Sequence, residues 1–399
     1  MLTKFAIIFI VALIFALIFY RLRLPELLGM LLAGVILGPH CLGWLSTEFI
    51  GEASELRTGA LIIILIRAGL GINKETLNKI GMSAAKMSFI PCLLEGSFVI
   101  AASWYILKFP LVESGILGFI LAAVSPAVIV PQMLNLIDAG YGKRKGVPTL
   151  ILAGASIDDV FAITFFGAFL GIALGETQNI TLAILNIPLR IGLGIAIGLL
   201  FGYLLALFFR RFDKIRDTKK VLIFMISAIV LYDMEKVLPI ASLVGIMAIG
   251  FIILEKNREV AKRLAAKFNK VWVFAEIILF VLIGAQVNLD VAFSSGLVGL
   301  AIIFIGLVGR SIGVFLSLIA SHFNEKERLF CVLSYVPKAT VQAAIGAIPL
   351  SMGIPSGELI LAIAVLSIVV TAPIGSILIK ATYRRLLEPP LAEGLRKEL

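Results

Sequence analysis

Long apolar stretches follow one another along almost the whole chain, and they restrict its fold more than any other feature. A helix that crosses a bilayer needs about 20 mostly apolar residues. Thirteen stretches approximately fit that requirement, at 3–20, 24–44, 58–72, 84–107, 114–137, 147–174, 181–209, 219–234, 238–255, 270–287, 296–320, 328–349 and 357–381. Backbone polar groups in lipid must be hydrogen-bonded within the protein, so we expect these stretches to be helices. The sequence therefore predicts an all-α polytopic membrane protein with about 13 transmembrane helices.

The composition excludes a soluble domain of this length. Hydrophobic residues make up 60% of the 399 residues and charged residues only 15%, and the mean hydropathy is +1.08. In a soluble protein the net charge of +10 would suggest a nucleic-acid partner. Here the positive residues lie in short loops between apolar stretches, which is typical of membrane topology. We therefore expect contact with membrane lipid and no binding of nucleic acid.

The loop charges also predict an orientation. Of the 35 lysines and arginines, 27 follow odd-numbered stretches and only four lie in the loops on the opposite side. Cytoplasmic loops of membrane proteins carry the excess of positive charge. We therefore expect a multi-pass protein of the cell (inner) membrane, with its N-terminus outside and its C-terminus in the cytoplasm.

Two glycine-containing patterns recur at nearly the same spacing. Residues 27–34 (LLGMLLAG) match residues 243–250 (LVGIMAIG), and residues 69–73 (GLGIN) match residues 284–288 (GAQVN), with offsets of 216 and 215. A single glycine match often reflects only close helix packing. Seven helices separate the partners, an odd number, so the two halves would have opposite orientations. Such an inverted-topology repeat is typical of secondary transporters, whose sites lie near the bilayer midplane.

Two of the apolar stretches contain polar, proline-containing interruptions at corresponding places. Residues 125–132 read SPAVIVPQ, and residues 337–342 read PKATVQ. Proline removes a backbone donor and disfavours helix in the residue before it, and one proline alone would indicate only a kink. Two interruptions in equivalent helices favour unwound segments that line an ion cavity.

Asp158 and Asp159 stand side by side within a stretch that is otherwise apolar from 148 to 174. A charge at the bilayer centre costs roughly 2.5 to 3.5 kcal/mol, so such a pair is expected to face protein, water or an ion. At about 1.5 Å per helical residue, Glu95, Arg310 and Lys338 lie at a similar depth. A carboxylate held away from water binds either a proton or a small hard cation such as Na⁺ or Li⁺. We therefore interpret the aspartate pair as a cation and proton site.

Glu95 and Arg310 differ by 215 positions, the offset of the repeat, and carry opposite charges. We expect a structural ion pair between them, because either charge alone would be costly at this depth. The alternative is that Arg310 pairs directly with Asp158. Two further charged residues receive simpler interpretations. Arg67 is expected to anchor its helix end, and Glu276 is expected at the membrane interface.

Six motifs occur together in this chain, at residues 67–70 (RAGL), 125–131 (SPAVIVP), 141–150 (YGKRKGVPTL), 156–159 (SIDD), 309–311 (GRS) and 337–343 (PKATVQA). Their combination resembles the NHA-type sodium/proton antiporters of the monovalent cation/proton antiporter superfamily. The resemblance runs from the third to the twelfth apolar stretch.

The resemblance implies a homodimer with an NhaA-like antiporter fold. A scaffold and dimer domain would comprise residues 1–83 and 219–290, an ion-transporting core residues 84–177 and 291–382, with a linker helix at 178–218 and a cytoplasmic tail at 383–399. The interrupted helices would cross within the core.

The same resemblance implies roles for particular residues. Asp159 would be the principal cation and proton carboxylate and Asp158 its neighbour. The cavity at the crossing would be lined by Ser125, Pro126, Lys338, Thr340 and Gln342. Where many electrogenic relatives carry a lysine beside the aspartates, this chain has Arg310, which keeps its proton.

We expect a secondary active transporter, not an enzyme, that exchanges Na⁺ (or Li⁺) for H⁺ by an elevator-type movement and needs no cofactor. K⁺/H⁺ exchange is the alternative within the class; a channel or an organic-anion symporter of related fold is a more distant one. An intramembrane aspartyl protease would need a Gly-x-Gly-Asp signature, which the chain lacks. The expected charges near the midplane sum to −1, from Glu95, Asp158, Asp159, Arg310 and Lys338. One cation or one proton would therefore neutralise the site, which favours electroneutral exchange. If Lys338 released its proton, two protons could exchange for one cation.

Overall fold

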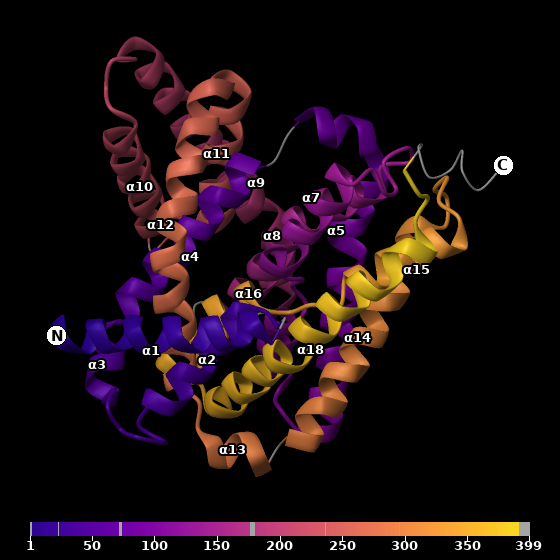
Figure 1. Ribbon diagram of the computed structural model, residues 1–399. Helices are drawn as coiled ribbons and strands as arrows, with labels where there is room; N and C mark the ends of the chain where they lie inside the picture. The colour runs from indigo at the N-terminus through magenta and orange to yellow at the C-terminus, as the bar shows by residue number, and fades with distance from the viewer. Residues whose placement is uncertain are drawn as a thin grey trace.

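The computed structural model describes residues 2–22, 24–71, 74–175, 180–235, 237–294 and 296–390, and all regular structure within these residues is helical (Figure 1). The helices are α1 (Leu2–Arg21), α2 (Glu26–Leu37), α3 (Thr47–Glu52), α4 (Ser54–Gly71), α5 (Lys74–Ala102), the π-helical turn η1 (Ser103–Leu107), α6 (Leu111–Leu121), α7 (Pro126–Asp138), α8 (Val147–Ala173), α9 (Ile180–Arg211), α10 (Asp217–Met234), α11 (Ser242–Lys256), α12 (Arg258–Ala285), α13 (Leu289–Ser294), α14 (Gly296–Leu318), α15 (Glu325–Ser334), α16 (Thr340–Ile345), α17 (Ile348–Ser351) and α18 (Gly357–Leu386).

Each of the thirteen predicted stretches coincides with one, two or three helices, which confirms the all-α polytopic membrane fold. Among the described residues, eight helical spans have both the length and the apolar composition to cross a membrane, and α2 and the segment 340–351 are shorter apolar helices. Two stretches are divided: 114–137 forms α6 and α7, and 328–349 forms α15, α16 and α17. The short helices α3 and α13 have no counterpart in the prediction.

Helix α12 begins at Arg258, twelve residues before its predicted start. The added turns are amphipathic, because Val260, Ala261, Leu264 and Phe268 are buried while the charged residues between them face outward. A hydropathy pattern that looks for continuous apolar residues misses such an extension, since only one face of it is apolar.

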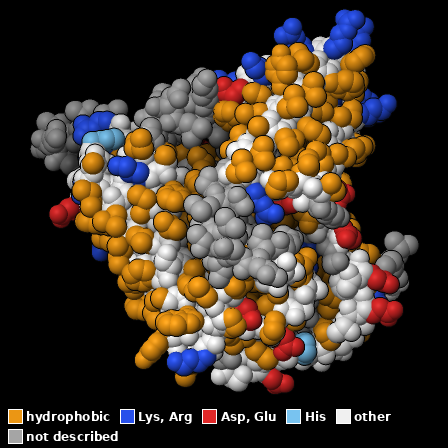
Figure 2. Space-filling model, turned by 180° about the vertical axis from the view of Figure 1, so that it is seen from behind, with side chains coloured by type: hydrophobic (Ala, Val, Ile, Leu, Met, Phe, Trp, Pro, Cys, Tyr) orange, Lys and Arg blue, Asp and Glu red, His pale blue; other side chains and the backbone are white. Residues whose placement is uncertain are grey.

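Apolar side chains cover much of the outer surface, as Figure 2 shows for one face. Large examples are Ile10 and Leu17 of α1, Ile226 of α10 and Phe304 of α14, each about half exposed or more. A soluble protein rarely exposes contiguous apolar surface of this extent. These faces therefore suit contact with lipid or with another protein within the membrane.

The repeat predicted from the glycine patterns appears in the packing. Gly284 of α12 lies so close to α2 that a Cβ there would overlap the carbonyl oxygen of Leu31. Gly69 of α4 lies in the same way against the carbonyl oxygen of Met247 in α11. The two contacts are related by the repeat, because Gly69 and Gly284 differ by 215 positions and Leu31 and Met247 differ by 216. The two halves thus pack equivalent helices by the same backbone contact, which only glycine permits at this distance.

The helices pack as two neighbouring groups. Helices α6, α8 and α14 pack on α5, α6 also packs on α8, and α7, α15 and α18 adjoin this group. Helices α1, α2, α4, α11 and α12 form the second group, with α9 and α10 packed on α11. In Figure 1, α8 and α16 lie near the middle of the molecule, with α14, α15 and α18 to one side and α1, α4, α10 and α11 to the other. Contacts of α16 with both α12 and α18 place the second interruption between the groups.

Candidate functional site

The two interrupted helices meet at their breaks. The backbone N–H of Ser125, which ends the break between α6 and α7, donates to the carbonyl of Pro337 at 2.8 Å. The backbone N–H of Lys338 donates to Thr371 Oγ1 of α18 at 2.8 Å. Proline accounts for both breaks: Pro126 begins α7 and Pro337 lies between α15 and α16, so the residues before them avoid helical geometry. The breaks begin slightly before the predicted motifs, because Pro126 and Thr340 each start a new helix.

Backbone groups freed by the first break are bound by side chains from other helices. The N–H of Val124 donates to Asp158 Oδ2 of α8 at 2.8 Å. Gln342 of α16 donates through Nε2 to the carbonyls of Ile120 at 2.9 Å and Ala123 at 2.8 Å. In lipid an unsatisfied backbone group is costly, so these contacts stabilise the unwound segment. Asp158 and Gln342 therefore hold the crossing in place.

Four charged side chains form a buried network beside the crossing. Arg310 of α14 contacts Glu95 of α5 through Nε, and its Nη2 lies 3.2 Å from Asp158 Oδ2. Lys338 Nζ donates to Glu95 Oε2 at 2.6 Å. Each residue is 1% exposed or less. The network holds two positive and two negative charges, so its formal charge is zero.

The network combines the two pairings that the sequence left as alternatives. Arg310 contacts Glu95 and Asp158 at once, and it also donates to the carbonyl of Ala122 in the first break. Lys338 had been expected to line a cavity, but its ammonium group lies within the network against Glu95. Counting residues from the helix ends predicts that the four charged groups lie at one depth. It does not predict which positively charged side chain pairs with which carboxylate.

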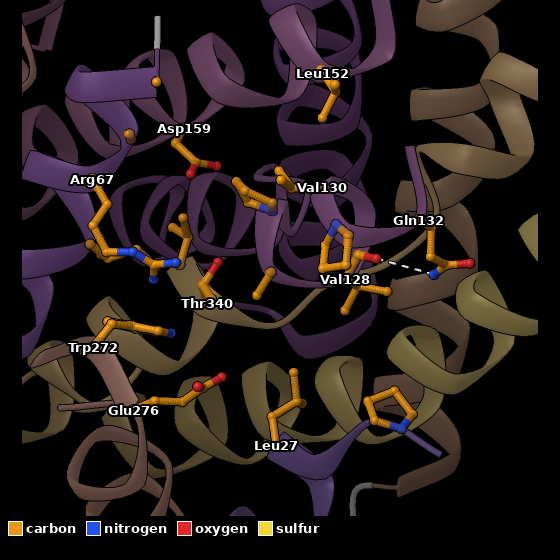
Figure 3. Close-up of a pocket in the computed structure, with 18 of the residues that line it drawn as sticks. Leu27, Arg67, Val128, Val130, Gln132, Leu152, Asp159, Trp272, Glu276 and Thr340 are labelled. Atoms are coloured by element: carbon orange, nitrogen blue, oxygen red, sulfur yellow. Dashed lines mark hydrogen bonds between the residues drawn. The ribbon is translucent and has the colours of Figure 1, made fainter. Parts of the chain in front are cut away.

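Asp159 stands apart from this network although it follows Asp158 directly. It lines a cavity of about 1330 Å³ between the two helix groups, together with Pro126 and Thr340 (Figure 3). Successive helical residues point about 100° apart, so Asp158 faces the network while Asp159 faces the cavity. Ser125 and Gln342, predicted as further lining residues, lie at the crossing and not among the residues that line this cavity.

Several oxygens near the crossing have no hydrogen-bond partner within the described residues. They include Asp159 Oδ1, Ser125 Oγ and Thr340 Oγ1, all buried. Buried polar atoms are nearly always bonded in proteins, so unpartnered oxygens at a crossing of broken helices suit a ligand. Carboxylate and hydroxyl oxygens are the donors that hard cations prefer. Among the described residues no group of three His, Cys, Asp or Glu side chains could hold a metal ion.

The opposite wall of the cavity carries charged residues that sequence reasoning placed elsewhere. Arg67 of α4 and Glu276 of α12 both line it, although the first had been expected as an anchor and the second at the interface. Arg67 Nε donates to Asn269 Oδ1 at 2.8 Å, and its guanidinium lies 4.9 Å from the Trp272 ring centroid. The sequence could have indicated this grouping, because residues 269, 272 and 276 are spaced three and four apart and therefore share one face of a helix.

A partly exposed ion-pair cluster lies where α7 and α18 end and where α8 and α15 begin. Arg144 of the α7–α8 loop binds Glu388 at 2.9 Å, and Lys145 binds Glu327 at 3.0 Å and Glu388 at 3.3 Å. The hydrogen bond to Glu327 raises the pKa of Lys145. Burial alone would raise the pKa of Glu388, but hydrogen bonds from Arg144 and Lys145 hold this pKa below its ordinary value. The backbone N–H of Gly142 also donates to the Glu388 carbonyl at 2.9 Å.

A helical membrane protein with an internal repeat, crossed interrupted helices and a carboxylate facing a large cavity belongs structurally to the secondary transporters. The family model "Sodium/hydrogen exchanger, transmembrane" matches residues 6–385. Human sodium/hydrogen exchanger 9B2 is 36% identical over 389 residues, which cover 92% of this chain and 70% of the relative. Human sodium/hydrogen exchanger 9B1 is 34% identical over 380 residues, covering 89% and 71%. The chain therefore belongs to the sodium/hydrogen exchanger family, a family of membrane transporters, as its motifs predicted.

The fold is also similar to a solved structure. The sodium proton antiporter MjNhaP1 from Methanocaldococcus jannaschii, solved at pH 8, superposes with a TM-score of 0.85 at 20% identity. The superposition covers 96% of this chain and 98% of that one. The likeness confirms the predicted antiporter fold.

Proposed function

We propose that the protein exchanges Na⁺ or Li⁺ for H⁺ by competition of the two ions for Asp159. The position of this carboxylate carries the proposal. Asp159 is 5% exposed, lines the cavity and has an oxygen without a partner among the described residues, while the charges around it are already paired. A buried carboxylate of this kind binds one cation or one proton, and binding of either excludes the other.

The contacts of Asp158 favour a positioning role for it. Its Oδ2 accepts from the Val124 N–H and lies 3.2 Å from Arg310 Nη2. An oxygen engaged in this way is less available to an incoming cation. Asp158 would then fix α8 against the broken helix and keep Asp159 turned toward the cavity, where Thr340 supplies a hydroxyl oxygen.

The charge balance supports exchange of one cation for one proton. The four-residue network is formally neutral, so Asp159 supplies the one uncompensated charge of the site. One Na⁺ or one H⁺ cancels that charge, and a neutral core can cross without working against the membrane potential, which costs about 2.3 kcal/mol per charge at 100 mV. The bond from Lys338 to Glu95 favours the charged form of the lysine in this arrangement, and one-for-one exchange requires that Lys338 keep its proton.

We further infer an elevator-type movement of one helix group against the other. The core would comprise residues 84–177 and 291–382, and the scaffold residues 1–83 and 219–290 of a homodimer. The packing groups and the cavity between them support this division. The cavity is also lined by Arg21 and Lys380, which follow odd-numbered stretches. By the predicted topology, the cavity would open to the cytoplasm.

The proposal is tested with purified protein in proteoliposomes under an imposed pH gradient. Addition of Na⁺ or Li⁺ should dissipate the gradient with the wild type, and K⁺ serves to test the alternative substrate. Asp159→Asn removes the charge that both ions need and should abolish exchange while the protein remains folded. Glu358→Gln, an exposed glutamate of α18 that does not line the cavity, is the matched control. Near wild-type dissipation by Asp159→Asn would contradict the assignment.

A further inference from the structure

The cavity wall opposite Asp159 carries a fixed positive charge. Arg67 is held by its hydrogen bond to Asn269 and by the Trp272 ring, and both of these residues lie on α12. Its guanidinium therefore lines the same water-accessible space as the proposed cation site. An arginine cannot lose its proton, so it repels any cation that enters.

Glu276 supplies an opposite charge on the same wall. It lies four residues after Trp272, on the same face of α12, and its side chain is partly buried. Arg67 and Glu276 lie on the neighbouring helices α4 and α12, and both line the cavity. In Figure 3 the side chains of Arg67, Trp272 and Glu276 project toward the same cavity as Asp159 and Thr340. The wall thus carries one basic and one acidic residue close to the proposed route of the cation.

A simpler interpretation is that the pair only fastens α4 to α12. Arg67 already has Asn269 and Trp272 for that purpose, and the glycine contacts of α4 and α12 with other helices provide further packing. Anchoring also does not explain why both charges face the cavity and not a lipid-exposed or sealed surface.

We propose that Glu276 neutralises the field of Arg67 within the cavity and thereby sets the affinity for the transported cation. Glu276 is not a ligand of the cation in this account; it is a positioning and affinity-determining residue on the scaffold side. Without it, Arg67 would lower the local cation concentration at Asp159. The inference rests on the proposed function, since it assumes that Na⁺ reaches Asp159 through this cavity.

The test measures the KM for Na⁺ and the maximal rate separately in proteoliposomes. Glu276→Gln should raise the KM for Na⁺ several-fold, with the maximal rate at saturating Na⁺ retained. Adding Arg67→Gln to Glu276→Gln should bring the KM back toward the wild-type value, because the repelling charge is then gone. Arg67→Gln alone should lower the KM. The effect of Glu276→Gln should also shrink as ionic strength rises, because added salt screens the field.

Glu358→Gln serves as the control for loss of a carboxylate outside the cavity and should leave both parameters unchanged. A KM for Na⁺ that stays at the wild-type value in Glu276→Gln, or one that Arg67→Gln fails to restore, would overturn the inference. If Glu276→Gln does not fold, Arg67→Gln decides, since an unchanged or higher KM there contradicts the account. Loss of exchange in Asp159→Asn together with an unchanged KM in Glu276→Gln would keep the proposed function and remove only this inference.

Discussion

The buried network of Glu95, Asp158, Arg310 and Lys338 predicts an order of stabilities for its variants. Arg310→Gln leaves two carboxylates with one cation, and that cation, Lys338, contacts only Glu95. Breaking a buried ion pair from one side costs roughly 3 to 5 kcal/mol, and we expect Arg310→Gln to lose at least that much. Lys338→Gln leaves Glu95 still paired with Arg310, so its loss should lie at or below the lower end of that range.

A double variant separates pairing from simple additivity. Replacing Glu95 and Lys338 together by glutamine removes one charge of each sign and leaves the Arg310–Asp158 contact intact. We therefore expect the double variant to be more stable than the sum of the two single losses predicts, with a coupling energy of about 1 to 3 kcal/mol. Combining Lys338→Gln with Glu327→Gln is the control, because Glu327 pairs with Lys145 outside the network.

The measurement is the free energy of unfolding of the purified variants in one detergent and lipid mixture, followed by denaturation and checked by thermal melting. The stability losses of Lys338→Gln and Glu327→Gln should add in their double variant to within about 0.5 kcal/mol. If the losses of Glu95→Gln and Lys338→Gln also add, the two groups do not act as a pair. Likewise, a Lys338→Gln variant less stable than Arg310→Gln would refute the reasoning that Arg310 is the centre of the network.

Exchange by both the wild type and Lys338→Arg should be insensitive to a potassium/valinomycin potential, provided that K⁺ is not a substrate. A voltage response that is present in the wild type and survives Lys338→Arg would contradict the charge balance, because no titrating base would remain at the site. Gly284→Val should lower the free energy of unfolding by more than about 2 kcal/mol, because its side chain overlaps the α2 backbone, whereas a melting temperature like the wild type's would contradict the close approach. Glu388→Gln should lower stability near neutral pH by less than about 1 kcal/mol, since its contacts with Arg144 and Lys145 are partly exposed. The pKa of the Glu388 carboxyl lies below its ordinary value, so the stabilisation is present above the ordinary value and is lost as the pH falls through the lowered one. A stability difference that persists at still lower pH would count against the ion pairs.

Much of the fold could be predicted because the membrane makes the sequence signals strong. Apolar length identified all thirteen segments, and the offset of about 215 residues identified equivalent glycines that meet their neighbours in the same way. The amphipathic start of α12 was missed, since a helix outside the lipid needs only one apolar face. The exact break points were also missed, because a proline can either interrupt a helix or begin one, as Pro126 does.

The sequence identified the four charged residues that meet beside the crossing, but it did not identify their pairings. Depth along the helices identified the charged residues near the midplane, but depth does not determine rotation about a helix axis. That rotation decides that Asp158 faces Arg310 while Asp159 faces the cavity. The same limitation hid Arg67 and Glu276, whose nearness to helix ends suggested an interfacial position although their side chains face the cavity.

The cation and the proton are proposed to share one carboxylate, Asp159, and the pH dependence of the KM for Na⁺ is a test of this sharing. If the two ions compete, then in the acid range where the site is protonated each drop of one pH unit should raise this KM about tenfold, because tenfold more Na⁺ is needed to displace the proton. The maximal rate at saturating Na⁺ should stay constant over the same range. A KM that does not change with pH while the maximal rate falls would contradict a shared site and would place the proton on a different group.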